Sequence, residues 1–185
     1  MQILKNPTSP FPQGTAVMLG QFDGFHRAHR RLAQLTVSYA QANSLIPVAF
    51  TFTGRKQKGT LLSTDEEKAA FFHGVGIQTL VTFDFETLRE MSPEDFTQQI
   101  LLSTLSANAV FCGFNYRFGK GAVASTRDLS RLLDARAALF VLPEMKDEKS
   151  GTSISSTNIR SLIEQKRYRD AERLLGHPLP ERFKR

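Results

Sequence analysis

Five short apolar runs, separated by amphipathic stretches, constrain the fold more than any other feature of this sequence. They are rich in β-branched and aromatic residues and are apolar at nearly every position, which is typical of strands buried on both faces. Because parallel strands are joined by helical crossovers, the alternation predicts an α/β protein with a doubly wound, five-stranded parallel sheet. The runs cover residues 16–20, 46–52, 79–83, 109–113 and 138–142.

The stretches between these runs carry helix signals. Apolar residues within 29–40 recur at the spacing of one buried helix face. Thr64 and Glu67 are spaced as a capping box, which predicts the start of a helix. Further helices are predicted from Ser92 and Pro93, from Ser155 or Ser156 to about residue 165, and over 168–175.

Length and composition limit the class of protein. A chain of 185 residues favours one domain. Cys112 is the single cysteine, which excludes a disulfide framework and an all-cysteine metal site and fits a reducing compartment. The longest apolar run, residues 137–142, is too short to span a bilayer, and no signal peptide is visible. We therefore expect a cytoplasmic protein without a membrane partner.

The net charge of +6 is compatible with an anionic ligand. A nucleic acid is one such anion, but the sequence has no uninterrupted basic run and no zinc-finger, RNP or leucine-zipper pattern. A phosphorylated small molecule needs only a few well-placed cations and N–H groups. We therefore expect small-molecule partners and no nucleic acid, and no pattern in the sequence predicts an oligomeric interface.

The loop after the first predicted strand has the composition of an anion site, at the sheet edge where doubly wound proteins bind their ligands. Gly20 and Gly24 permit tight turns and close backbone approach. His26 and His29 are three residues apart and would share one face of the first turn of a helix. Free N–H groups attract anions there, and imidazoles can add hydrogen bonds to phosphate oxygens.

Other interpretations of this loop stay open. The two histidines can be ordinary surface residues, and a His-x-x-His pair can bind zinc, although no third ligand lies nearby in the sequence. Asp23 can orient a water or a metal, or simply cap the helix.

The loop after the fourth predicted strand combines glycines, cations and aromatic residues. Asn115 can accept and donate hydrogen bonds at a base or ribose edge, and Arg117 and Lys120 can meet phosphate. The alternative is a loop whose aromatic side chains plug into the core. We expect that alternative for Phe114 and Phe118.

The helix predicted after the fifth strand opens on successive hydroxyl residues that include Ser156 and Thr157. Hydroxyls at a helix start offer donors to phosphate, and Arg160 lies one turn later. The alternative is a plain helix cap. A fourth loop, residues 54–59, carries three cations between two glycines and is expected to be a solvated loop.

Three of these segments, in register, resemble the prokaryotic FAD synthetase family. Residues 20–29 resemble its G-N-F-D-G-x-H-x-G-H signature, and residues 113–121 are similar to its G-E-[DN]-F-x-F-G-x-x loop. Residues 154–160 resemble its [IV]-S-S-T-x-[IV]-R motif, and residues 171–176 its closing A-x-x-L-L-G stretch. The resemblance covers almost the whole chain.

The resemblance implies a Rossmann-like nucleotidyltransferase fold and a transferase of FAD biosynthesis. Such an FMN adenylyltransferase moves AMP from ATP to FMN, giving FAD and pyrophosphate, with Mg²⁺ held mainly by the ATP phosphates. Residues 1–185 are then one FMN adenylyltransferase-like domain, without the riboflavin kinase domain that usually follows it in the family.

The resemblance also implies roles for single residues. His26, His29 and Arg160 are the expected catalytic residues. Phe52, Arg55 and Phe118 are expected on the flavin side, and no residue is expected to be a dedicated metal ligand. The expected ATP-binding residues are Gly20, Gln21, Phe22, Asp23, Gly24, Asn115, Ser156 and Thr157.

The sequence departs from the family pattern at three places. Gln21 replaces the usual Asn, and Ala28 replaces the Gly between the two histidines, where its methyl group can crowd the phosphates. Residues 53–59 lack the Pro-containing segment that is common after the second strand. Two alternatives therefore stay open: adenylyl transfer to another phosphomonoester, and a non-catalytic nucleotide- or flavin-binding protein.

Overall fold

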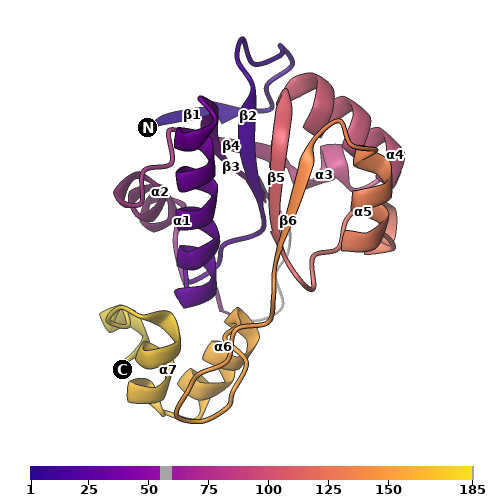
Figure 1. Ribbon diagram of the computed structural model, residues 1–185. Coiled ribbons are helices and arrows are strands. Elements are labelled where there is room, and N and C mark those ends of the chain that lie inside the picture. The colour runs from indigo at the N-terminus through magenta and orange to yellow at the C-terminus, as the bar shows by residue number, and fades with distance from the viewer. Residues whose placement is uncertain (55–59, 185) are drawn as a thin grey trace.

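The computed structural model describes residues 1–54 and 60–184, and within them a single parallel sheet organises the chain (Figure 1). Its strand order is β1-β4-β3-β2-β5-β6, and all the pairings are parallel. The five predicted strands are β2–β6, which confirms the doubly wound parallel sheet. The strands are β1 Gln2–Lys5, β2 Thr15–Leu19, β3 Ile46–Thr53, β4 Thr79–Asp84, β5 Ala107–Gly113 and β6 Ala138–Leu142.

Strand β1 is a sixth strand that the sequence pattern did not predict. It is four residues long, is mostly exposed, and pairs with β4 at one edge of the sheet. Only two of its residues, Ile3 and Leu4, are apolar, so its pattern carries no signal of a buried strand.

Helices cover both faces of the sheet. On one face, α1 (Arg27–Ala42) and α2 (Asp65–Gly74) pack against strand residues that include Met18 and Phe111. On the other face, α3 (Phe85–Leu88), the π-helical η1 (Phe96–Thr104) and α5 (Thr126–Leu133) form a second apolar core with residues that include Val17 and Phe50. The short α4 (Pro93–Asp95) leads directly into η1.

Local sequence chemistry explains where the helices begin. The capping box that opens α2 is present: the Thr64 side chain accepts from the Glu67 N–H, and the Glu67 carboxylate accepts from the Thr64 N–H. Pro93 stands at the first position of α4, as predicted, but the helix that follows is wound as a π-helix. Helix α5 was not among the predicted helices.

The change of helix layer between neighbouring strands positions the site. Helix α1 leads from β2 to β3 on one face, whereas α5 leads from β5 to β6 on the other. Because β2 and β5 are adjacent, their following loops diverge and leave a crevice at their carboxyl ends.

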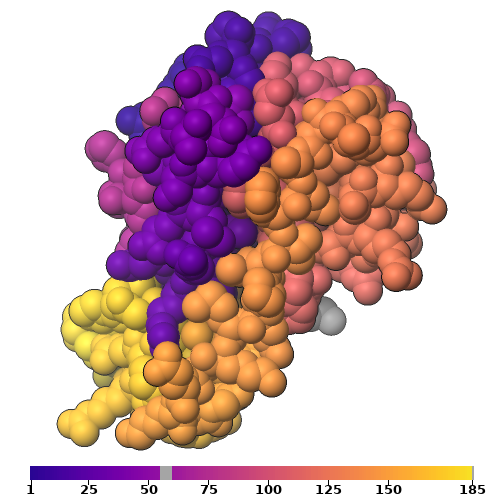
Figure 2. Space-filling view, in the orientation of Figure 1, coloured from indigo at the N-terminus to yellow at the C-terminus, as the bar shows by residue number. Residues whose placement is uncertain are grey.

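The chain beyond β6 forms a C-terminal lobe at that same end of the sheet (Figures 1 and 2). The lobe contains α6 (Ser156–Glu164), α7 (Tyr168–Leu175) and the 3-10 turn η3 (Glu181–Phe183). These elements share a separate apolar cluster, which also takes in Leu62 from the loop before α2 and packs against Ala28 of α1. The lobe therefore closes one side of the crevice.

The structure also bears on two further expectations, the burial of the last strand and the absence of a membrane span. Strand β6 is not buried on both faces as predicted: Phe140 and Val141 are exposed, because β6 is an edge strand. In the part of the chain that the structure describes, no helix has the length and apolar character needed to cross a membrane.

Candidate active site

A cavity of about 440 Å³ opens at the carboxyl ends of β2 and β5, under the C-terminal lobe. Its walls come from all three loops that the sequence singled out. The predicted residues that line it are Gly20, Gln21, Phe22, Asp23, His26, His29, Phe52, Asn115, Ser156, Thr157 and Arg160.

His26 and His29 stand at the start of α1 with their rings stacked. The ring centroids are 3.6 Å apart and the planes are 17° from parallel. His26 is the N-cap residue, and its Nδ1 accepts from the His29 N–H at 3.4 Å. The rings of Phe22 and His29 form a T-shaped pair at a centroid distance of 5.3 Å. The pair is thus fixed by the helix start and by the turn before it.

Burial keeps both imidazoles neutral in the free protein. It lowers the pKa of His26 from 6.5 to about 4. The pKa of His29 is lowered well below its ordinary value by burial and by the neighbouring His26. Nδ1 of His29 is buried and has no hydrogen-bond partner among residues 1–54 and 60–184. Negative charge brought into the cavity would favour the protonated form of these rings.

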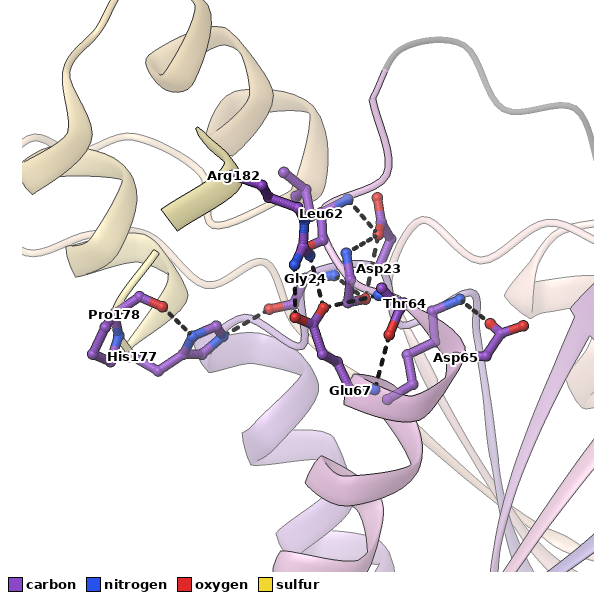
Figure 3. Close-up of polar contacts among 11 residues, drawn as sticks. Asp23, Gly24, Leu62, Thr64, Asp65, Glu67, His177, Pro178 and Arg182 are labelled. Atoms are coloured by element: carbon purple, nitrogen blue, oxygen red, sulfur yellow. Dashed lines mark hydrogen bonds and ion pairs between the residues drawn. The ribbon is translucent and has the colours of Figure 1, made fainter. Parts of the chain in front are cut away.

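The Asp23 side chain joins the loop after β2 to the loop before α2 and to α6, and it does not cap α1. Its side chain is only 3% exposed. Oδ1 accepts from the backbone N–H groups of Leu62 and Ser63 at 2.9 and 3.1 Å (Figure 3). Oδ2 accepts from Nη1 of Arg160 at 2.7 Å. The capping interpretation is therefore wrong: the carboxylate turns away from the helix start, and His26 takes the cap.

Arg160 reaches the cavity from the first turns of α6. Its side chain is 21% exposed. Asp23 is the one partner found for Arg160 within the described ranges, and the contact uses a single Nη1–H group. A guanidinium has five N–H donors, so most of them stay free for an anion. Ser156 also ties α6 to the first loop, because its hydroxyl donates to the backbone oxygen of Asp23 at 2.8 Å.

Of the two phenylalanines in the loop after β5, both expected in the core from the residue pattern, only Phe118 lies there. Phe118 is 5% exposed and lies in the core, 5.6 Å from Phe96, so its placement on the flavin side is wrong. Phe114, which was expected in the core, is 48% exposed and lines the cavity. Phe118 is also fixed by a backbone bridge to Ala124, with hydrogen bonds of 3.2 Å in both directions.

Three other predictions need correction or completion. Gly24 does not line the cavity, because its N–H donates to the Ser63 hydroxyl and its carbonyl oxygen faces His177. Its φ of +77° favours glycine, and an added Cβ would lie 2.9 Å from Leu62. Lys120 pairs with Glu90 at 2.8 Å instead of lining the cavity. Arg55 lies outside the described residues.

The sequence analysis missed the segment that supports Asp23. Leu62 and Ser63 carry no signature beyond their position before the Thr64 cap, yet their amides hold the buried carboxylate. As for metals, no group of three or more His, Cys, Asp or Glu side chains in residues 1–54 and 60–184 could hold an ion. Of the donor groups nearest the cavity, the Asp23 carboxylate is bound by Arg160 and by backbone amides, and Nδ1 of His26 accepts from the His29 N–H.

Comparison with solved structures finds the same fold elsewhere. The chain superposes with a TM-score of 0.84 on a crystal structure titled "Macrolide-efflux Protein" from Streptococcus pneumoniae. The match covers 97% of this chain and 72% of that chain at 24% sequence identity. This likeness shows the fold.

Curated relatives carry names from flavin biosynthesis. A bifunctional riboflavin kinase/FMN adenylyltransferase of Listeria monocytogenes is 28% identical over 169 residues, covering 86% of this chain and 53% of that protein. A second protein of the same organism, named FAD synthetase, is 29% identical, with 90% and 70% covered. The bifunctional protein of Bacillus subtilis is 27% identical, with 90% and 55% covered.

The chain thus spans about half the length of the bifunctional relatives. A family model described as FAD synthetase matches residues 8–158, which include the first two loops of the site and the start of α6. By that match over most of its length, the chain belongs to the FAD synthetase family.

Proposed function

We propose that this chain transfers AMP from ATP to FMN, giving FAD and pyrophosphate. One observation carries the proposal: two stacked imidazoles, a guanidinium and the N-terminal ends of α1 and α6 line a single cavity at the switch point of the sheet. Helix N-termini and such donors favour a polyphosphate. The names of the relatives supply the identity of the two substrates.

The reaction needs positioning and charge neutralisation more than a protein nucleophile. An oxygen of the FMN phosphate attacks the α-phosphorus of ATP and forms a new P–O bond. The bond from that phosphorus to the oxygen bridging to the β-phosphate breaks, and its electron pair leaves with pyrophosphate. Enzymes accelerate such in-line transfers chiefly by holding both phosphates and by stabilising the developing charge.

The two histidines are proposed to stabilise the transition state. They are neutral in the free protein. A neutral imidazole carries one ring N–H, so each can donate one hydrogen bond to a phosphate oxygen. The charge of the triphosphate favours their protonation, which strengthens those hydrogen bonds where charge builds.

Arg160 is proposed to bind the departing pyrophosphate, with Ser156 and Thr157 at the N-terminus of α6. Asp23 holds one N–H of the guanidinium and so aims the others. In this proposal Asp23 does not touch ATP; it acts through Arg160.

Gly20, Gln21, Phe22 and Asn115 are proposed to form the rest of the nucleotide site, because all of them line the cavity. Phe52 and Phe114 lie on the same walls and offer apolar faces to a planar acceptor. Mg²⁺ is proposed to enter with ATP on phosphate oxygens and water, which suits a site whose own carboxylate is already paired.

The test mixes purified protein with ATP, Mg²⁺ and FMN and follows FAD and pyrophosphate together. We expect both products in equal amounts. If FMN gives no FAD but another phosphorylated acceptor releases pyrophosphate from ATP, the protein transfers AMP to that other phosphomonoester. Binding of ATP with neither product from any acceptor would identify a non-catalytic nucleotide-binding protein.

A further inference from the structure

The segment after α7 lies against the loop before α2, whose amides bind Asp23, and Arg182 contacts that loop directly. We propose that Arg182 is a positioning residue for the adenylyl transfer, acting through the Leu62–Ser63 peptide on Asp23 and thereby on Arg160. This inference rests on the proposed function. It concerns a residue beyond the segment matched by the family model.

Arg182 contacts both the first turn of α2 and the loop before it (Figure 3). Nη1 and Nη2 donate to the two carboxylate oxygens of Glu67, each at 2.7 Å. Nη2 also donates to the backbone oxygen of Leu62 at 3.0 Å. The bidentate pair fixes the guanidinium plane, and the third contact directs one nitrogen at the loop backbone.

The Leu62 carbonyl belongs to the same peptide group as the Ser63 N–H. That N–H donates to Oδ1 of Asp23 at 3.1 Å. A cation on the carbonyl oxygen polarises the peptide and strengthens its N–H as a donor. The charge of Asp23 is in turn one of the causes that raise the pKa of Arg182, after the hydrogen bond and the charge of Glu67.

The contacts that lead from Arg182 through the Leu62–Ser63 peptide to Asp23 continue to the cavity. Asp23 accepts from Arg160 with its other oxygen at 2.7 Å. Arg182 itself does not line the cavity, so the effect proposed here is indirect and runs through these contacts. Glu67 stiffens the arrangement, because the carboxylate that binds Arg182 also accepts from the Thr64 N–H in the cap of α2.

A second contact holds the same segment to the first loop. Nε2 of His177 lies 3.0 Å from the backbone oxygen of Gly24, next to Asp23. The C-terminal segment therefore touches the residue after Asp23 as well as the loop on its other side. Loss of Arg182 is expected to loosen the Leu62–Ser63 side alone.

The experiment compares Arg182→Gln and Arg182→Lys with Lys184→Gln. Lys184 lies in the same segment and pairs with Glu172 and Glu181, so its loss removes equal charge without touching the loop. We expect Arg182→Gln to weaken Mg·ATP binding and kcat/KM for ATP about tenfold, because small misplacements of an anion-binding group are costly. KM for FMN should stay within about twofold. Arg182→Lys should restore part of the loss, and Lys184→Gln should match the wild type.

A double-mutant cycle separates positioning from general stability. In an Arg160→Gln background, Arg182→Gln should cause no further loss of kcat/KM, because the residue through which it acts is gone. Losses that multiply, or equal behaviour of Arg182→Gln and Lys184→Gln, would overturn the proposal. The unfolding temperature of each variant shows whether the fold is intact.

The same variants distinguish this inference from the proposed function. If the wild type forms no FAD, the proposed function fails, and the affinity for Mg·ATP in calorimetric titrations decides the inference alone. A wild type that does not bind Mg·ATP would overturn both.

Discussion

Arg160 and Asp23 form a 2.7 Å ion pair although 137 residues separate them in the chain. The pair joins the C-terminal lobe to the loop after β2, and Asp23 is almost fully buried. A buried carboxylate needs partners for both oxygens, and here a cation serves one oxygen while backbone amides serve the other. The same contact therefore contributes to the fold and sets the position of the guanidinium.

Asp23→Asn tests the structural part of this role. The substitution removes the charge opposite Arg160, and we expect the free energy of unfolding to fall by about 3 kcal/mol. Asp65→Asn is the matched control, because Asp65 is an exposed partner of Lys68 and should change stability by less than about 1 kcal/mol. Urea unfolding of both variants gives the comparison. Equal stabilities would mean that the buried pair contributes nothing.

His26→Asn tests the histidines without disturbing the helix start. Asparagine can still accept from the His29 N–H as an N-cap, but it removes the ring that faces the cavity. We expect kcat to fall by about 10²–10³, as for loss of a donor to developing charge, with little change in FMN affinity. His73→Ala, at the exposed end of α2, is the control and should be without effect. Retention of wild-type kcat would make the stacked pair a structural feature only.

Stability should fall as the solution becomes acidic. The pKa of His26 is lowered to about 4 by burial, so the unfolded chain, with a histidine pKa near 6.5, binds the proton more readily. The stabilisation is therefore complete above about pH 6.5 and is lost as the pH falls toward 4, by about 3 kcal/mol for this residue. His29 acts in the same direction. Urea unfolding at several pH values should show this slope, and His26→Asn should reduce it; a flat profile would contradict the burial of a neutral ring.

Phe114 and Phe118 should respond in opposite ways to alanine substitution. Phe114→Ala removes an exposed ring from the cavity wall, so we expect a higher KM for FMN and unchanged stability. Phe118→Ala empties a core position and should cost about 3–5 kcal/mol of stability. Steady-state kinetics and urea unfolding measure the two effects. The reverse pattern would place Phe118 at the acceptor.

Ala28→Gly tests whether the departure from the family pattern affects catalysis. Ala28 lines the cavity but also packs against the apolar cluster of the C-terminal lobe. We expect a loss of about 1 kcal/mol in stability from helix propensity and lost packing, and a change in kcat below about twofold. The exposed Gln34→Gly in the same helix controls for propensity. A large gain in kcat would show instead that the methyl group crowds the phosphates.

Secondary-structure elements that depend on short stretches of sequence could be predicted from the sequence. Residues 138–142 and 168–175 coincide with β6 and α7, because both predictions depend only on residues within the segment itself. The capping box at Thr64 is equally local. Strand β1 and helix α5 escaped prediction because one is an exposed edge strand and the other is a single short amphipathic segment.

The candidate site likewise has features that the sequence predicted and features that it did not. The glycines, histidines and hydroxyls mark the loops that line the cavity, since strands in a doubly wound sheet end at one edge. The exposure of Phe114 beside the buried Phe118 was not predictable, because the burial of these loop side chains depends on tertiary packing.

By itself, the sequence determined the alternation of strands and helices, the order of the three loops and the glycine, histidine and hydroxyl residues that they carry. Only the tertiary structure decided that Asp23 is bound by Arg160, by the Leu62–Ser63 amides and, through them, by Arg182. The physical reason is that periodicity and capping act over one or two turns of chain, whereas a buried carboxylate takes its partners from whichever segments the packing brings to it.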